Sequence, residues 1–218
     1  MAPKLYVTEA SPPARAALMI AAALKVEVVK VDIDLFKKEH LTPEFLKKNP
    51  EHTIPTLEDG DFFLGDSHAI ASYLANAYAK DDSLYPKDAK KRAVIDSRLQ
   101  FDNSTLFARF KNVVRPMLYF GETDIPKDKI DAIVEAYGIV EAFLDTNQWV
   151  AGDQPSIADY SCITSIGALD ILIPISKTEY PKLAAWIKRC YSLPFYMEIC
   201  APGESKLRDL IESKINRT

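Results

Sequence analysis

The chain has 218 residues, of which 48% are hydrophobic, and a formal net charge of −4 at pH 7. This length suits one large or two small domains, and the apolar content is ordinary for a globular protein. The sequence has no basic block that would indicate nucleic-acid binding. No segment approaches the roughly 18 uninterrupted apolar residues of a membrane-spanning helix, and no signal-peptide pattern is present. We therefore expect a soluble, cytoplasmic protein that binds neither nucleic acid nor membranes.

Strand and helix patterns alternate through the first 80 residues. In chain order they predict a strand at 4–7, a helix at 12–24, a strand at 26–31, a helix at 41–48, a hairpin of 54–57 with 62–64 around an Asp-Gly turn, and a helix that starts at 66 or 67 and reaches 77. The order βαβαββα predicts an α/β domain over residues 1–80, with helices on both faces of its sheet. A helical crossover joins the first two strands, so we expect them to be parallel.

A polar stretch that contains Pro86 follows, and we interpret residues 81–88 as a linker. The remaining residues, 89–218, show helical patterns only, which predicts an all-helical second domain. Its first element is one long amphipathic run over 89–120, with Pro116 near its end and Gly121 after it. Later helices are predicted from Ile130 to Leu144, from the capping-box sequence Ser156-Ile157-Ala158-Asp159, after Pro181, and from about 204 to 216.

Several kinds of site are unlikely on sequence grounds. Cys162, Cys190 and Cys200 are odd in number and form no CxxC pair, so we expect buried free thiols. The three histidines have no ligand-like spacing, so we expect no metal site. No serine has the nucleophile-elbow context of a hydrolase, and with seven glycines in all there is no phosphate-binding glycine loop.

The segment Ser11-Pro12-Pro13 lies where the first predicted strand leads into a helix. Serine is a preferred helix N-cap and proline suits the first helical position. Such a helix end offers unpaired N–H donors and a partial positive charge, which suit an anion such as a thiolate. Taken alone, Ser11 serves either as an anion site or simply as a cap.

Two further segments carry possible binding groups. If the Ile54–Pro55 bond is cis, the backbone of Ile54 is exposed at the sheet edge and can pair with an extended peptide; the alternative is a trans proline that begins a strand. Asp66 and Ser67 at a helix start match an ammonium and a carboxylate, or they form a simple cap. His40 and His52 are donors for a second carboxylate, or exposed loop histidines.

An apolar stripe follows the long helical run at helical spacing. Its members are Phe107, Phe110, Val114 and Leu118. The stripe either packs in the core or lines a pocket for a hydrophobic ligand. Lys111 lies beside it and is either solvated or able to reach a ligand.

Taken in order, these segments resemble the cytosolic glutathione transferases. The matching segments are Leu5-Tyr6, Ser11-Pro12-Pro13, Asn49-Pro50, His52-Thr53-Ile54-Pro55-Thr56-Leu57, Asp66-Ser67-His68-Ala69-Ile70, Asp82-Ser83-Leu84-Tyr85-Pro86-Lys87-Asp88 and Ser156-Ile157-Ala158-Asp159. The Ser-Pro-Pro and His-Thr-Ile-Pro elements are most similar to the insect epsilon class, with the delta class as its neighbour. The resemblance covers essentially the whole chain. It implies a thioredoxin-like domain that binds glutathione, an all-helical domain that lines a hydrophobic substrate site, and a homodimer.

The resemblance also implies a role for each candidate residue. Ser11 would donate its hydroxyl to the glutathione thiolate, and Ile54 would pair with the cysteinyl backbone before a cis Pro55. The remaining glutathione contacts would come from His40, His52, Thr53, Asp66, Ser67 and Lys111. The electrophile pocket would be lined by Pro13, Leu35, Phe107, Phe110, Val114 and Leu118.

Two positions depart from the pattern of this family. The family usually has Glu where this chain has Asp66, which reaches less far. It often has Cys after the proline pair, where this chain has Ala14. Neither change removes the helix cap at Ser11.

The expected activity is conjugation of glutathione to small hydrophobic electrophiles, as in detoxification. A variant would use the thiolate as a base for dehydrochlorination or isomerisation. The alternatives from other classes are a carrier that binds hydrophobic ligands without turnover and a thiol-disulfide oxidoreductase. The last requires a cysteine at the helix start, where this chain has Ser11.

Overall fold

A four-stranded sheet lies at the centre of the N-terminal domain in the computed structural model, which describes residues 2–214. The strands are β1 (Lys4–Val7), β2 (Val29–Asp32), β3 (Thr56–Asp59) and β4 (Phe62–Gly65), in the order β2-β1-β3-β4. As predicted, β1 and β2 are parallel and β3 and β4 form an antiparallel hairpin. The second strand begins three residues later than the predicted Val26, because Val26 still belongs to the turn that ends the first helix and donates its N–H to Ala21 O at 2.8 Å.

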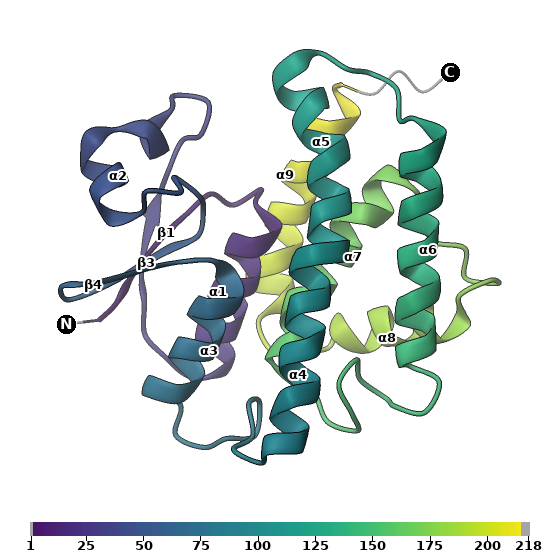
Figure 1. Cartoon of the computed structure of the whole chain (residues 1–218), viewed down its shortest axis with the longest axis horizontal. Coiled ribbons are helices and arrows are strands. Elements are labelled where there is room, and N and C mark those ends of the chain that lie inside the picture. Colours follow the sequence, from purple (N-terminus) through teal and green to yellow (C-terminus); the bar gives the residue numbers. More distant parts are fainter. Residues whose placement is uncertain (1, 215–218) are drawn as a thin grey trace.

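Helices cover both faces of this sheet, as the sequence predicts (Figure 1). Helices α1 (Pro12–Ala23) and α3 (Ser67–Ala77) lie between the sheet and the helical domain, and the short α2 (Pro43–Lys48) lies on the other side. The predicted helix at 41–48 begins later, at Pro43, because Thr42 is its N-cap and accepts a hydrogen bond from the Phe45 N–H. A separate 3₁₀ turn, η1 (Glu39–Leu41), precedes it.

The long helical run at 89–120 is present, but its middle is not an α-helix. Helix α4 (Ala89–Phe101) continues through a π-helical segment, η2 (Asp102–Phe107), into α5 (Ala108–Phe120). Gly121 ends the run in the left-handed conformation, with φ of 75°. π-Helical turns are frequent at functional sites, where the extra residue redirects side chains.

The rest of the second domain is helical, as predicted. It contains α6 (Lys127–Phe143), α7 (Ile157–Leu172), α8 (Pro181–Cys190), a π-helical turn η3 (Tyr196–Cys200) and α9 (Ala201–Glu212). The predicted capping box is confirmed at the start of α7, where Asp159 accepts from the Ser156 N–H at 2.9 Å. Helix α9 starts three residues before the predicted 204, and its predicted end near 216 lies outside the described residues.

The predicted free thiols are present in the structure. All three cysteines are free and buried. Between Ala77 and Ala89 the chain forms neither helix nor strand, and Asp88 caps α4 through hydrogen bonds from the Lys90 and Lys91 N–H groups. No helix in the described part of the chain is both long and apolar enough to cross a membrane.

Helix α1 forms most of the junction between the two domains. It packs against α7 and also contacts η3 and α9, while α3 contacts α7. Its inward side chains Met19 and Ile20 are fully buried. Because α1 is shared by both cores, the position of its N-terminal cap depends on the helical domain as well as on the sheet.

Candidate active site

Ser11 caps α1 directly after the first strand. Its hydroxyl oxygen accepts a hydrogen bond from the Ala14 N–H at 3.4 Å, and its own N–H donates to Thr8 O at 3.0 Å. The side chain is half-buried. The oxygen is an acceptor in the cap, so the hydroxyl proton remains available to donate to an anion at the helix end. Cap and anion site are therefore compatible at this residue.

The C-terminal domain packs against the loop that presents Ser11. A Cβ atom on Gly203 would lie 2.2 Å from Glu9 O and 2.6 Å from Arg15 Cδ, so only glycine allows α9 to approach this closely. Lys206 forms an ion pair with Glu9, and the buried Arg15 donates from Nη1 to Cys200 O at 3.1 Å. Sequence patterns do not show these contacts, because nearly 200 residues separate the partners.

Tyr6, which lies on the strand before Ser11, has its hydroxyl engaged elsewhere. It donates to Glu58 Oε2 at 2.6 Å, and its ring packs edge-on against Phe45 at a centroid distance of 5.7 Å. Burial, reinforced by the hydrogen bond to Glu58, raises the pKa of Tyr6. Tyr6 is therefore a protonated structural residue beneath α2, which leaves Ser11 as the hydroxyl at the helix end.

The Ile54–Pro55 peptide bond is cis, as the binding interpretation of this segment requires. Strand β3 begins only at Thr56, so the backbone of Ile54 lies outside the strand register. Asn49 holds the loop: its amide donates to Thr53 Oγ1 at 3.1 Å and to Thr56 Oγ1 at 2.9 Å. The sequence interpretation noted Asn49 only as part of a motif and assigned it no role.

The structure brings the two loop histidines together. The ring centroids of His40 and His52 are 6.2 Å apart. Burial, with a contribution from the neighbouring His52, lowers the pKa of His40. No described residue bonds the buried His40 Nδ1, which leaves a donor or acceptor for a ligand. These two rings can thus face one carboxylate together.

Asp66 and Ser67 lie at the start of α3, as predicted. Asp66 has a φ of 65°, and its Oδ1 accepts from the N–H groups of His68 at 2.9 Å and Ala69 at 3.0 Å. The neighbouring His68 imidazole, whose Nδ1 lies 3.5 Å from Oδ1, is the main cause that lowers the pKa of Asp66 to about 2. The carboxylate is therefore ionised at neutral pH and can pair with an ammonium group.

His68 links this helix start to the π-helical segment. Its Nε2 lies 2.8 Å from Asp102 Oδ2, and its Nδ1 lies 3.5 Å from Asp66 Oδ1. Burial lowers the pKa of His68, but the hydrogen bond to Asp102 and the nearby carboxylate of Asp66 outweigh it and raise the pKa to about 9. Sequence reasoning missed this buried imidazolium. His68 belongs to a noted motif, but Asp102 is 34 residues away in the chain.

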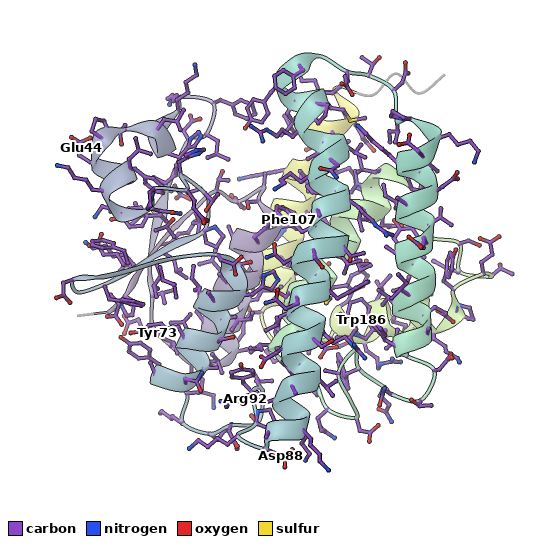
Figure 2. All side chains as sticks on the ribbon, viewed as in Figure 1. Glu44, Tyr73, Asp88, Arg92, Phe107 and Trp186 are labelled. Atoms are coloured by element: carbon purple, nitrogen blue, oxygen red, sulfur yellow. The ribbon has the colours of Figure 1, made fainter. Side chains whose placement is uncertain are left out.

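The apolar stripe of the long helix is divided by burial. Phe110 and Val114 are 3% and 7% exposed, whereas Phe107 and Leu118 are half-buried. The rings of Phe107 and Phe110 are 6.2 Å apart. Figure 2 shows Phe107 on the part of the long helix that runs beside the N-terminal domain.

Other predicted contact residues lie at the surface or near it. Pro13 and Leu35 are half-buried, and Lys111 and Thr53 are exposed. Phe36 and Tyr119, which the sequence interpretation missed, bring rings from the two domains to within 6.4 Å of each other.

Among the described residues, no group of three or more His, Cys, Asp or Glu side chains could hold a metal ion.

Comparisons with known proteins agree along the whole chain. The family models for the glutathione S-transferase N-terminal and C-terminal domains match residues 5–82 and 94–194. Glutathione S-transferase 1 of Manduca sexta is 44% identical, covering 97% of this chain and 98% of the relative.

Solved structures give the same result. An epsilon-class glutathione S-transferase from the housefly, Musca domestica, is 46% identical with a TM-score of 0.95, covering 97% of this chain and 98% of that one. A glutathione transferase homologue from Drosophila mojavensis, with bound glutathione, is 46% identical with a TM-score of 0.95, covering 98% of this chain and 97% of that one. A thioredoxin-like domain followed by an all-helical domain, a serine that caps the first helix and full-length similarity place this chain in the glutathione S-transferase family.

Proposed function

We propose that this chain, which is a glutathione transferase, ionises bound glutathione through Ser11 when it transfers glutathione to small hydrophobic electrophiles. The observation that carries this proposal is the position of Ser11 at the N-terminus of α1, with its hydroxyl proton free to donate. Tyr6, the rival hydroxyl on the preceding strand, already donates its proton to Glu58. Glutathione itself then provides the reactive thiol as co-substrate.

The glutathione site is proposed along the edge of the N-terminal domain. Ile54, before cis Pro55, would pair with the cysteinyl backbone. Ionised Asp66 would bind the γ-glutamyl ammonium, and the N-terminus of α3 at Ser67 would bind its carboxylate. The remaining proposed contacts, mainly to the glycyl carboxylate, are His40, His52, Thr53 and Lys111.

The chemistry rests on tuning the thiol pKa. A free thiol titrates near pH 8.5, and only the thiolate attacks. A hydroxyl hydrogen bond together with a helix N-terminus would lower that pKa by roughly two units, which is about 2.7 kcal/mol of thiolate stabilisation. Most bound glutathione would then be ionised at neutral pH, with the electrophile held beside the sulfur.

The electrophile is proposed to bind between α1 and the long helix. Half-buried Phe107 and Leu118 would contact it, with buried Phe110 and Val114 as the floor and Pro13 and Leu35 on the opposite side. A substrate panel that includes chlorinated and isomerisable compounds separates conjugation from dehydrochlorination and isomerisation. Binding of hydrophobic ligands with no turnover of any of them would instead indicate a carrier.

The test of the proposal is Ser11→Ala. We expect turnover to fall at least tenfold while glutathione affinity changes much less, because the hydroxyl acts on the charge of the sulfur. The pKa of bound glutathione, followed by the ultraviolet absorbance of the thiolate, should rise towards 8.5. Tyr6→Phe is the control and should leave that pKa in place. Loss of activity in Tyr6→Phe together with full activity in Ser11→Ala would overturn the role proposed for Ser11.

The domain boundaries and the homodimer belong to the same proposal. Residues 1–80 would form the glutathione-binding domain, 81–88 the linker and 89–218 the substrate domain, which agrees with the lack of regular structure between α3 and α4.

The edge strand β4 exposes Phe62 and Phe63, and α4 exposes Val94. An exposed apolar edge strand favours burial against a second copy. Sedimentation equilibrium measures the association.

A further inference from the structure

A hollow lies between the two domains, at the end of α1 that points away from Ser11. It has a volume of about 320 Å³, and its walls come from the end of α1, the segment after α3, the start of α7 and the loop after α8. Helix α1 has 12 residues, so its two ends are about 18 Å apart. The hollow is therefore separate from the proposed glutathione site.

The floor of the hollow is apolar, with one polar group that has no protein partner. Leu24 and Leu193 are 9% and 8% exposed. Tyr160 also lines the hollow and is only 2% exposed as a residue; its hydroxyl oxygen keeps some exposure and makes no hydrogen bond with any described residue. Burial raises the pKa of Tyr160 to about 12, so this hydroxyl is a hydrogen-bond donor at neutral pH.

Positive charge prevails at the rim. Lys25 and Lys80 both line the opening and are exposed, and Lys80 makes no ion pair within the described chain. The one acidic residue of the rim, Asp81, accepts hydrogen bonds from the backbone N–H of Ser83 at 3.0 Å and from its hydroxyl at 2.5 Å. An apolar floor, a hydroxyl donor that lines the hollow and an unpaired lysine together match a ligand with an apolar body and one negative charge.

We propose that this hollow binds a small amphipathic carboxylate. The carboxylate faces Lys80 and the Tyr160 hydroxyl, and the apolar body lies against Leu193. The volume is at the lower end of the roughly 300–1,000 Å³ range of small-ligand pockets, so the ligand is a short acid and not a long-chain lipid. The occupant touches both domains, because Lys80 follows α3 and Tyr160 belongs to α7.

The test is calorimetric titration of the full chain with octanoate, alone and in the presence of saturating S-hexylglutathione. We expect saturable binding with the same affinity in both cases. Octylammonium should bind at least tenfold more weakly. No saturable binding, or displacement of octanoate by S-hexylglutathione, would overturn the proposal. Failure of S-hexylglutathione to bind would instead contradict the proposed transferase function, and the titration of the chain alone would still test the hollow.

Two variants and two matched controls locate the binding. Tyr160→Phe and Lys80→Glu should each weaken the binding of octanoate about tenfold. Tyr160→Phe should leave the melting temperature unchanged, because its hydroxyl bonds to no protein group. In Tyr137→Phe, which loses a 2.8 Å hydrogen bond to Ile173 O, the melting temperature should fall and the octanoate affinity should stay. Lys91→Glu on α4 controls for net charge. If both Tyr160→Phe and Lys80→Glu bound octanoate as tightly as the parent chain, the proposal would be wrong.

Discussion

At the scale of single residues, the site depends on groups whose hydrogen bonds leave one function free. Ser11 accepts a bond within its cap and keeps its proton, while Tyr6 donates its proton to Glu58 and has none to offer. Asp66 uses Oδ1 for the cap of α3, which leaves Oδ2 to meet an ammonium. Chemically similar residues thus differ in function because their partners differ.

Asp66→Ala should weaken glutathione binding about tenfold to a hundredfold, because loss of a charge-assisted hydrogen bond costs about 1.5–3 kcal/mol. The α3 cap is lost as well, which costs about 1 kcal/mol of stability. Asp66→Asn separates the two effects, because it keeps a capping oxygen and removes the charge. Glutathione affinity is measured by calorimetry. An unchanged affinity in both variants would show that the shorter Asp66 does not reach the ligand.

Phe110→Ala and Phe107→Ala compare two neighbours on one helix. Phe110 is 3% exposed, so its truncation should cost about 3–5 kcal/mol of stability. Truncation of the half-buried Phe107 should cost less stability than truncation of Phe110. It should alter the ranking of hydrophobic substrates more. Thermal melts and a substrate panel measure both effects. A stable Phe110→Ala variant with altered substrate preference would place Phe110 in direct contact with the electrophile.

At the scale of elements, α9 holds the loop before α1 in place. Helix α9 can pack against this loop only because Gly203 has no side chain. A Cβ atom at that position would lie 2.2 Å from Glu9 O. Glu9 lies two residues before Ser11, so a shift of α9 would move the Ser11 hydroxyl. We therefore regard Gly203 as a positioning residue.

Gly203→Ala should displace the Glu9 loop and lower kcat several-fold more than Gly138→Ala, in which nothing lies within 4 Å of the added Cβ. Both substitutions introduce alanine into a helix, so the propensity change alone is slightly favourable in each. The readout is kcat against KM, together with the pKa of bound glutathione. Equal kinetics in the two variants would show that α9 does not position Ser11.

At the scale of the whole molecule, the pair His68–Asp102 joins the glutathione domain to the long helix. The folded-state pKa of His68 is raised to about 9 from an ordinary value of 6.5. The stabilisation is therefore fully present below about pH 6.5 and is lost as the pH rises through about 9. We expect the free energy of unfolding to fall by about 3 kcal/mol over this window.

Urea unfolding at several pH values measures this slope. His68→Gln should be less stable at pH 6 and should lack the decline between pH 6.5 and 9. His52→Gln is the control, because His52 is an exposed loop residue, and it should keep the slope of the parent chain. A parental slope in His68→Gln would show that other groups cause the pH dependence.

The sequence by itself determined the order of elements and the family. Hydrophobic periodicity, the Asp-Gly turn, the cap at Ser11 and the capping box at Ser156 are local signals, because each depends on residues within a few positions of one another. They were sufficient for the order of strands and helices along the chain, for the parallel first pair of strands and for the helix that Asp66 caps. The order of the strands within the sheet came only from the structure. The class of fold followed from these signals.

Only the tertiary structure showed the contacts between residues that are far apart in the sequence. The π-helical segment places Asp102 against His68, Gly203 meets Glu9 across the domain boundary, and Tyr160 opens into a hollow with Lys80. Each of these contacts joins elements that are separated in the chain, and local periodicity carries no information about such pairs. The burial that distinguishes Phe110 from Phe107 also arises only when the helices pack.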